Sequence, residues 1–134
     1  MKRPRTLKAA KHRAWRAISN FVRSAAADDE GYAQCITCGN IDHWKNLHAG
    51  HYVHGLTYGK DKDGPFVWVE NVHPQCAGCN TYRNGQLHIY TLWMVDMYGR
   101  DFTEGLIVER HKPVKMSIDD YWKIEREFYD ALEA

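Results

Sequence analysis

Two Cys-x-x-Cys pairs, Cys35/Cys38 and Cys76/Cys79, constrain this chain more than any other feature, and they contain all four of its cysteines. A Cys-x-x-Cys turn directs two thiolates at one point, and two such turns supply the tetrahedral sulfur set that structural zinc prefers. The sequence therefore predicts one structural Zn²⁺ that joins two distant segments. Disulfides and unligated cysteines are the alternatives, and a reducing compartment favours the metal.

The size and hydropathy of the chain set the broad class. A chain of 134 residues with 44% apolar content can bury one modest core, which a bound zinc ion would help to stabilise. No apolar run approaches the roughly 18 residues of a membrane span, and no apolar segment follows the basic N-terminus as it would in a secretory signal. We therefore expect a soluble intracellular protein without a membrane partner.

Positive charge is concentrated at the N-terminus. The net charge is only +1, but residues 1–27 contain eight Lys and Arg and no acidic residue, while the remainder contains ten against seventeen Asp and Glu. Such an arm suits a polyanion, because each neutralised phosphate releases counterions. We expect DNA contacts from this arm, outside the zinc-bound segment, and from one later arginine: Arg3, Arg5, Lys8, Lys11, Arg13, Arg16 and Arg83. A merely solvated helix face is the alternative.

Periodicity predicts an α+β fold. Apolar spacing predicts a helix over 7–26, and β-branched and aromatic residues predict strands over 47–53 and 65–69, separated by a mobile loop over 55–64. A helix from Asn80 to Gly99, interrupted at Asn84-Gly85, and another over 101–111 follow. A capping box at 117–120 opens a final helix, and the apolar stripes of these C-terminal helices suit a core or a dimer contact. We divide the chain into a basic helix (1–30), a zinc-bound core (31–99) and C-terminal helices of the same domain (100–134).

The order of motifs in the central segment is specific. After Cys35 and Cys38 come His-Ala-Gly-His-Tyr at 48–52, Asn-Val-His-Pro-Gln at 71–75, and a second cysteine pair followed directly by an asparagine. This order resembles the HNH, or ββα-metal (His-Me finger), nucleases, and most resembles the phage NinG (Rap) recombination nucleases. A more distant resemblance is to Holliday-junction resolvases of the endonuclease VII type. The likeness covers roughly residues 32–132.

The resemblance implies a function. It implies a zinc-stapled ββα-metal core with a basic N-terminal helix and C-terminal helices, acting as a Mg²⁺-dependent DNA endonuclease in which Mn²⁺ could replace Mg²⁺. Branched recombination intermediates are the implied substrates, and the cytoplasm of a bacterial host, with the gene carried by a phage or prophage, is the implied setting. Cutting both strands of a junction would suit a homodimer, although the residues leave the oligomeric state open.

The resemblance also implies roles for individual residues. His51 matches the general base, Asn80 matches a ligand of the catalytic divalent ion, and Asn71 matches the asparagine that braces the loop. Many related sequences carry an Asp or His ligand immediately before the base, where this chain has Gly50. His48 is our candidate for the missing ligand. Strand alternation places positions 48 and 51 on opposite faces, so we expect a bulge at Ala49-Gly50.

Other interpretations of the same residues stay open. His48 and His51 could complete a Cys2His2 zinc site with Cys35 and Cys38, which would remove the base and leave the second pair without partners. His73 is expected to support a ligand or to bond to the backbone. The whole chain could also be a non-catalytic zinc-ribbon regulator that binds nucleic acid, or a structural phage protein.

Overall fold

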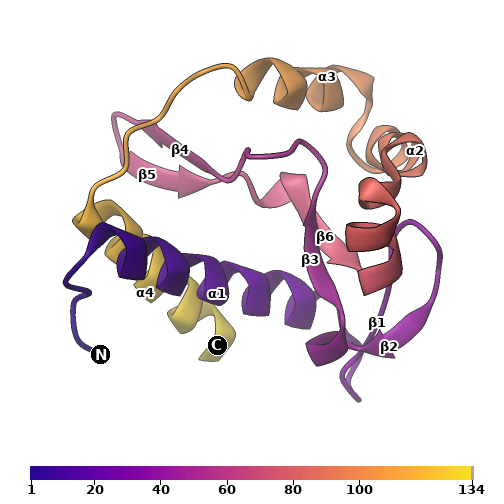
Figure 1. Ribbon diagram of the computed structural model, residues 1–134, viewed down its shortest axis with the longest axis horizontal. Coiled ribbons are helices and arrows are strands. Elements are labelled where there is room, and N and C mark those ends of the chain that lie inside the picture. Colours follow the sequence, from indigo (N-terminus) through magenta and orange to yellow (C-terminus); the bar gives the residue numbers. More distant parts are fainter. Residues whose placement is uncertain (134) are drawn as a thin grey trace.

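The computed structural model describes residues 1–133 and has an α+β fold, as predicted (Figure 1). The helices are α1 (Leu7–Ala25), α2 (Leu87–Tyr98), α3 (Arg100–Glu109) and α4 (Ile118–Glu133). The strands are β1 (Tyr32–Gln34), β2 (Ile41–His43), β3 (His48–His51), β4 (Tyr58–Asp61), β5 (Gly64–Val67) and β6 (Val72–Gln75). Short helical segments are η1 (Trp44–Asn46), η2 (Val69–Asn71), η3 (Gly78–Tyr82) and η4 (Asn84–Gln86). No helix among these residues is long and apolar enough to cross a membrane.

The basic helix α1 is part of the core. The Thr6 hydroxyl caps it by accepting a hydrogen bond from the Ala9 amide at 3.1 Å. Its apolar stripe, including the fully buried Ala10 and Ile18, packs against α4 in a cluster that also contains Ile124, and the two helices lie side by side in Figure 1. The helix predicted over 7–26 is therefore confirmed, and small alanines on one face of α1 let α4 approach closely.

The structure contains more strands than the sequence predicted. The antiparallel partner of β3 is β6, whereas β5 pairs with β4 in a separate hairpin. The predicted loop over 55–64 is wrong, because Asp61 pairs with Gly64 across a tight turn. In that turn the Asp61 carboxylate accepts from the Asp63 amide at 2.8 Å, and Gly64 adopts φ +108°, which favours glycine.

The helical segment after the second cysteine pair is interrupted where the sequence predicts. It begins as the π-helical turn η3 and breaks at Asn84, Gly85 and Gln86, which all have positive φ, before α2 starts at Leu87. Gly99 ends α2, as predicted. The predicted capping box is also confirmed, since the amides of Ser117 and Asp120 each donate to the other's side chain.

The two-stranded β3–β6 sheet lies between α1 and α2. The Trp15 ring of α1 stacks on His51 of β3, and the Tyr90 hydroxyl of α2 donates to the Gly50 carbonyl at 2.8 Å. A second core cluster joins the segment after β3 to α2 and α3 through Tyr52, Leu56, Met94 and their neighbours. The β3–β6 sheet, which carries His48, His51 and His73, therefore lies between the two core clusters.

Candidate metal centre and adjoining cleft

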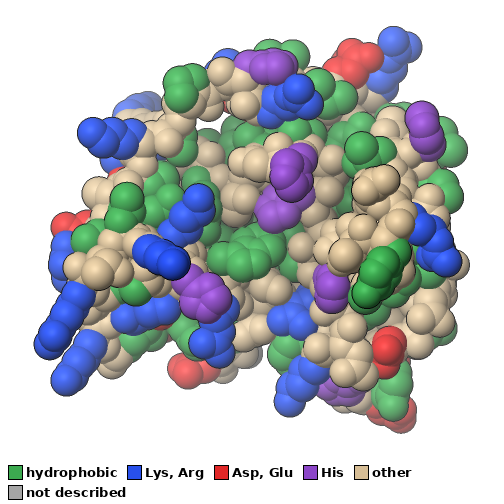
Figure 2. All heavy atoms as spheres, viewed as in Figure 1, with side chains coloured by type: hydrophobic (Ala, Val, Ile, Leu, Met, Phe, Trp, Pro, Cys, Tyr) green, Lys and Arg blue, Asp and Glu red, His purple; other side chains and the backbone are tan. Residues whose placement is uncertain are grey.

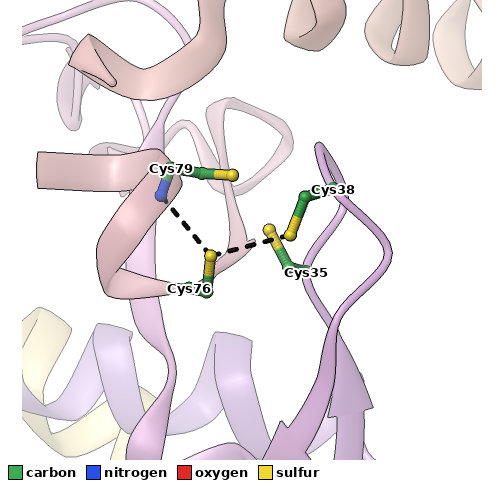
Figure 3. A group of neighbouring side chains, drawn as sticks. All are labelled: Cys35, Cys38, Cys76 and Cys79. Carbon is green, nitrogen blue, oxygen red and sulfur yellow. Dashed lines mark hydrogen bonds between the residues drawn. The ribbon is translucent and has the colours of Figure 1, made fainter. Parts of the chain in front are cut away.

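The four cysteines come together in one cluster (Figure 3). Their Sγ atoms all lie within 4.8 Å of one another, and Cys38 Sγ lies 3.7 Å from Cys76 Sγ. Tetrahedral zinc with Zn–S bonds of about 2.3 Å needs sulfurs about 3.8 Å apart, so the cluster fits zinc. The cysteines are therefore placed to hold a metal such as zinc, and the alternative Cys2His2 set, which leaves out Cys76 and Cys79, is wrong.

The thiols of Cys35 and Cys38 differ in how readily they lose a proton. Burial opposes ionisation of Cys35, but hydrogen bonds from the Thr37 side chain and nearby backbone groups outweigh it and lower the pKa of Cys35 to about 6. A backbone hydrogen bond at Asn40 favours ionisation of Cys38, but burial and the three neighbouring thiols raise its pKa to about 12. Several thiolates cannot share this space without a positive charge, which a divalent metal supplies.

The side chains of His48 and Asn80 lie in contact on one face of the β3–β6 sheet. The register runs without interruption from His48 opposite Gln75 to His51 opposite Val72, so the predicted bulge at Ala49-Gly50 is wrong. The pleat consequently turns His48 and His51 to opposite faces. His48 Nδ1 lies 3.0 Å from the side-chain nitrogen of Asn80, which lies in η3 next to Cys79.

His51 is half-buried on the other face. Its ring stacks on Trp15 with centroids 4.8 Å apart, and its Nε2 lies 2.7 Å from the Thr57 hydroxyl. Burial, with a smaller effect of the His54 charge, lowers the pKa of His51 to about 4. The imidazole is therefore neutral near pH 7, and one of its ring nitrogens is unprotonated and can accept a proton. Neither Trp15 nor Thr57 has a sequence signal that would link it to position 51.

Asn71 locks the segment that follows β3. Its side chain is fully buried; its amide donates to the carbonyls of Val53 at 2.9 Å and Leu56 at 2.6 Å, and its oxygen accepts from the Val53 amide at 2.8 Å. These bonds hold both ends of the turn from Val53 to Leu56, which leads to Thr57. Asn71 thus sets the path of the segment on either side of the His51 contact.

A cleft of about 690 Å³ opens beside β3. His51 and Asn80 both line it, although they lie on opposite faces of the β3–β6 sheet, and Arg110 at the end of α3 lines it as well. His54 is the exposed wall residue that follows β3. In Figure 2, histidine side chains gather in the hollow at the centre of the face. The cleft therefore combines a neutral imidazole, an amide and a cation.

The structure divides the predicted DNA-binding residues into two groups. Arg3 pairs with Asp119 at 2.7 Å and Arg13 pairs with Glu125 at 3.0 Å, so both connect the N-terminal segment to α4. Of the predicted set, the exposed residues that form no ion pair among residues 1–133 are Arg5, Lys8, Lys11, Arg16 and Arg83. Arg83 also donates to Cys79 Sγ at 3.7 Å, which places it beside the cysteine cluster.

His73 belongs to an aromatic network that the sequence did not indicate. Its two ring nitrogens lie 3.0 Å from the Tyr90 hydroxyl and 2.8 Å from the Tyr98 hydroxyl. Burial lowers the pKa of His73 to about 4. Because Tyr90 also holds the Gly50 carbonyl, this network fixes the middle of β3 against α2.

Comparison with known proteins gives one match. The family model described as NinG: Bacteriophage Lambda NinG protein matches residues 2–134. No curated protein matches the chain. No solved structure matches it either.

Proposed function

This chain belongs to the NinG family, and from that premise we propose that it is a metal-dependent DNA endonuclease with a zinc-stapled ββα-metal core. We propose that it hydrolyses phosphodiester bonds in branched recombination intermediates. The observation that carries the proposal is that His51 and Asn80, a candidate base and a candidate ligand, line the same cleft. Asn71 supports it by fixing the segment after His51 from a fully buried position.

The local topology is compatible with a ββα-metal core. Two antiparallel strands, β3 and β6, are followed directly by a helical segment that begins with the second cysteine pair. Cys79 and Asn80 are neighbours in the chain, so a zinc ion in the cysteine cluster would limit the movement of Asn80. In this proposal zinc has a structural role and a second, hard cation assists the chemistry.

His48 and Asn80 are the residues that would hold the hard cation. Adjacent ligands of octahedral Mg²⁺, at about 2.1 Å from the ion, are roughly 3 Å apart, and His48 Nδ1 lies 3.0 Å from the Asn80 carboxamide. Bound Mg²⁺ or Mn²⁺ would neutralise charge that develops on the scissile phosphate and on the leaving oxygen. Both side chains are at least partly exposed, so DNA phosphate can reach them.

His51 would act as the general base. When Nε2 donates to the Thr57 hydroxyl, Nδ1 is left unprotonated to accept a proton from water. An imidazole with a pKa of about 4 is a weak base, but it is fully in the accepting form at neutral pH. A DNA phosphate in the cleft would favour the imidazolium and so raise the pKa of His51 toward the range that suits base catalysis.

The charge distribution favours DNA approach from the same side. In Figure 2, Lys and Arg side chains gather over α1 beside the hollow that contains histidines. The exposed α1 cations Lys8, Lys11 and Arg16 would neutralise backbone phosphates, and Arg110 would contact DNA within the cleft. We place the enzyme in the cytoplasm of a bacterial host and expect a homodimer on a four-way junction, to be checked by light scattering.

The deciding experiment compares cleavage of branched and linear DNA by zinc-loaded protein with Mg²⁺ and after chelation of Mg²⁺. We expect cleavage only with the added cation, and 5′-phosphate and 3′-hydroxyl products. His51→Ala should lower the rate on the order of 10²-fold or more, whereas the exposed His88→Ala is the matched control. DNA binding with no cleavage under any condition would refute the nuclease and support the zinc-ribbon regulator instead.

A further inference from the structure

Gln75 is a fully buried polar residue whose amide orientation is fixed. It lies on β6 opposite His48, and its exposed fraction is 0%. Its Nε2 donates to the Thr37 hydroxyl at 3.1 Å and to the Gly85 carbonyl at 2.9 Å. Since a carbonyl can only accept, the nitrogen must face Gly85 and the oxygen must face the other way.

The Gln75 oxygen has no hydrogen-bond partner among residues 1–133. It lies against Gly50, where an added Cβ would be 2.0 Å from Gln75 Oε1 and 3.1 Å from Asn80 Oδ1. Two amide oxygens therefore border the same small space with no donor between them. A buried acceptor without a partner is costly, so this arrangement calls for a donor.

A half-turn of the Asn80 carboxamide supplies that donor. Its two ends have nearly the same shape, so the turn exchanges nitrogen and oxygen without moving the helix. The Asn80 nitrogen then faces Gln75 Oε1, and the Asn80 oxygen takes the place beside His48 Nδ1 that the nitrogen occupies at 3.0 Å. An oxygen and an imidazole nitrogen side by side form a better cation site than two nitrogens.

We propose that Gln75 is a positioning residue: its buried oxygen accepts a hydrogen bond from the Asn80 amide and thereby turns the Asn80 oxygen toward a divalent cation shared with His48. This inference rests on the cation site of the proposed function. Gly50 is required by the same arrangement, because any side chain at that position would collide with Gln75 Oε1.

The same residue connects the cation site to the cysteine cluster. Thr37 accepts from Gln75 and lies within the first Cys-x-x-Cys turn, with its hydroxyl 3.3 Å from Cys35 Sγ. Zinc bound by Cys35 and Cys38 would fix the position of Thr37 between them. The Thr37 hydroxyl would then fix the Gln75 amide, whose oxygen would orient the Asn80 carboxamide. Hydrogen-bond partners behind metal ligands commonly change metal affinity by about 10- to 100-fold.

The test measures Mn²⁺ affinity of zinc-loaded protein by electron paramagnetic resonance in two backgrounds. Gln75→Met should weaken Mn²⁺ binding about 10-fold in the parent. An aspartate at position 80 has two equivalent oxygens and needs no orienting partner. In the Asn80→Asp background the same Gln75→Met change should therefore alter Mn²⁺ affinity less than about twofold. An equal loss in both backgrounds would assign Gln75 a merely structural role and overturn the inference.

Two further measurements keep the outcomes distinct. If Gln75→Met fails to fold or loses zinc, Thr37→Val serves instead, because it keeps the side-chain shape and leaves the Gly85 acceptor of the Gln75 amide in place. It also removes the contact with Cys35 Sγ, so zinc content is measured in parallel; we expect a loss of a few fold in Mn²⁺ affinity that also disappears with Asn80→Asp. Mn²⁺ binding that is abolished by His48→Ala but unchanged by both variants would overturn this inference alone. A parent protein that binds no Mn²⁺ would refute the cation site and this inference together.

Discussion

The ion pair between Arg13 and Glu125 gives a sharp test of whether the N-terminal cations serve folding or DNA binding. Arg13 Nε lies 3.0 Å from the Glu125 carboxylate, and the Arg13 guanidinium also donates to the Lys2 carbonyl at 2.7 Å. The Glu125 side chain is only 3% exposed, whereas that of Arg13 is 30% exposed. Arg13→Met keeps much of the aliphatic stem and removes the charge, which leaves a carboxylate buried at the α1–α4 contact.

The expected cost follows from these exposures. Removing one partner of a buried ion pair typically costs about 3–5 kcal/mol, because the other charge stays buried without compensation. Water can reach the Arg13 side of this pair, so we expect the lower end, about 3 kcal/mol of unfolding free energy. For a chain of this size that corresponds to a fall in Tm of roughly 10 °C. Replacing both residues, as in Arg13→Met with Glu125→Leu, should recover most of the loss.

Urea denaturation and DNA binding of zinc-loaded protein, measured in parallel, separate the two roles. Lys11→Met is the matched control, an exposed cation on the same helix without an ion pair among the described residues. It should leave stability unchanged and weaken DNA binding. If Arg13→Met is as stable as the parent and lowers DNA affinity as much as Lys11→Met does, our assignment of Arg13 to the core contact is wrong.

Three further predictions concern the metal cluster, the basic face and the buried imidazoles. Cys76→Ser should lower zinc from one ion per chain to none and unfold the domain, as measured by metal analysis and circular dichroism; a folded, zinc-free variant would contradict this. Replacing Lys8, Lys11 and Arg16 by Ser should reduce the logarithmic salt slope of DNA binding by up to about 0.9 per lost contact without changing stability, and an unchanged slope would exclude these contacts. The pKa of His73 is about 4 in the folded protein and about 6.5 when unfolded, so the unfolded state binds more protons between these values and stability should rise with pH there. His73→Gln should reduce that slope by up to about 1.4 kcal/mol per pH unit, and identical urea-derived slopes for the two proteins would show that His73 is not buried in its neutral form.

Local signals in the sequence predicted the helices and the cysteine cluster. The α1 stripe, the Ser117 capping box and the stop at Gly99 depend on neighbours within one or two turns, so periodicity and capping chemistry suffice. The cysteine spacing suffices for a metal cluster because ligand chemistry restricts it strongly.

Strand pairing and the surroundings of the histidines could not be predicted in the same way. β6 contains Pro74, which weakens a strand signal, so the sequence predicts strands over 47–53 and 65–69 but none at β6, the actual partner of β3. The contact between Trp15 and His51 joins residues with no common pattern. Gln75 carries no polar motif of its own, and only the three-dimensional arrangement brings its oxygen beside Gly50.

The pairing of α1 with α4 has a consequence for how the chain folds during synthesis. Arg13 and Glu125 are 112 residues apart in the sequence, so the partner of α1 leaves the ribosome long after α1 itself. At about 5–20 residues per second, α1 waits on the order of 10 s before its apolar stripe can be covered. Contacts of such long range also slow folding once the chain is complete. The eight cations of residues 1–27, five of them within α1, would keep this exposed segment from aggregating, so charge at the N-terminus would serve the nascent chain before it serves the folded protein.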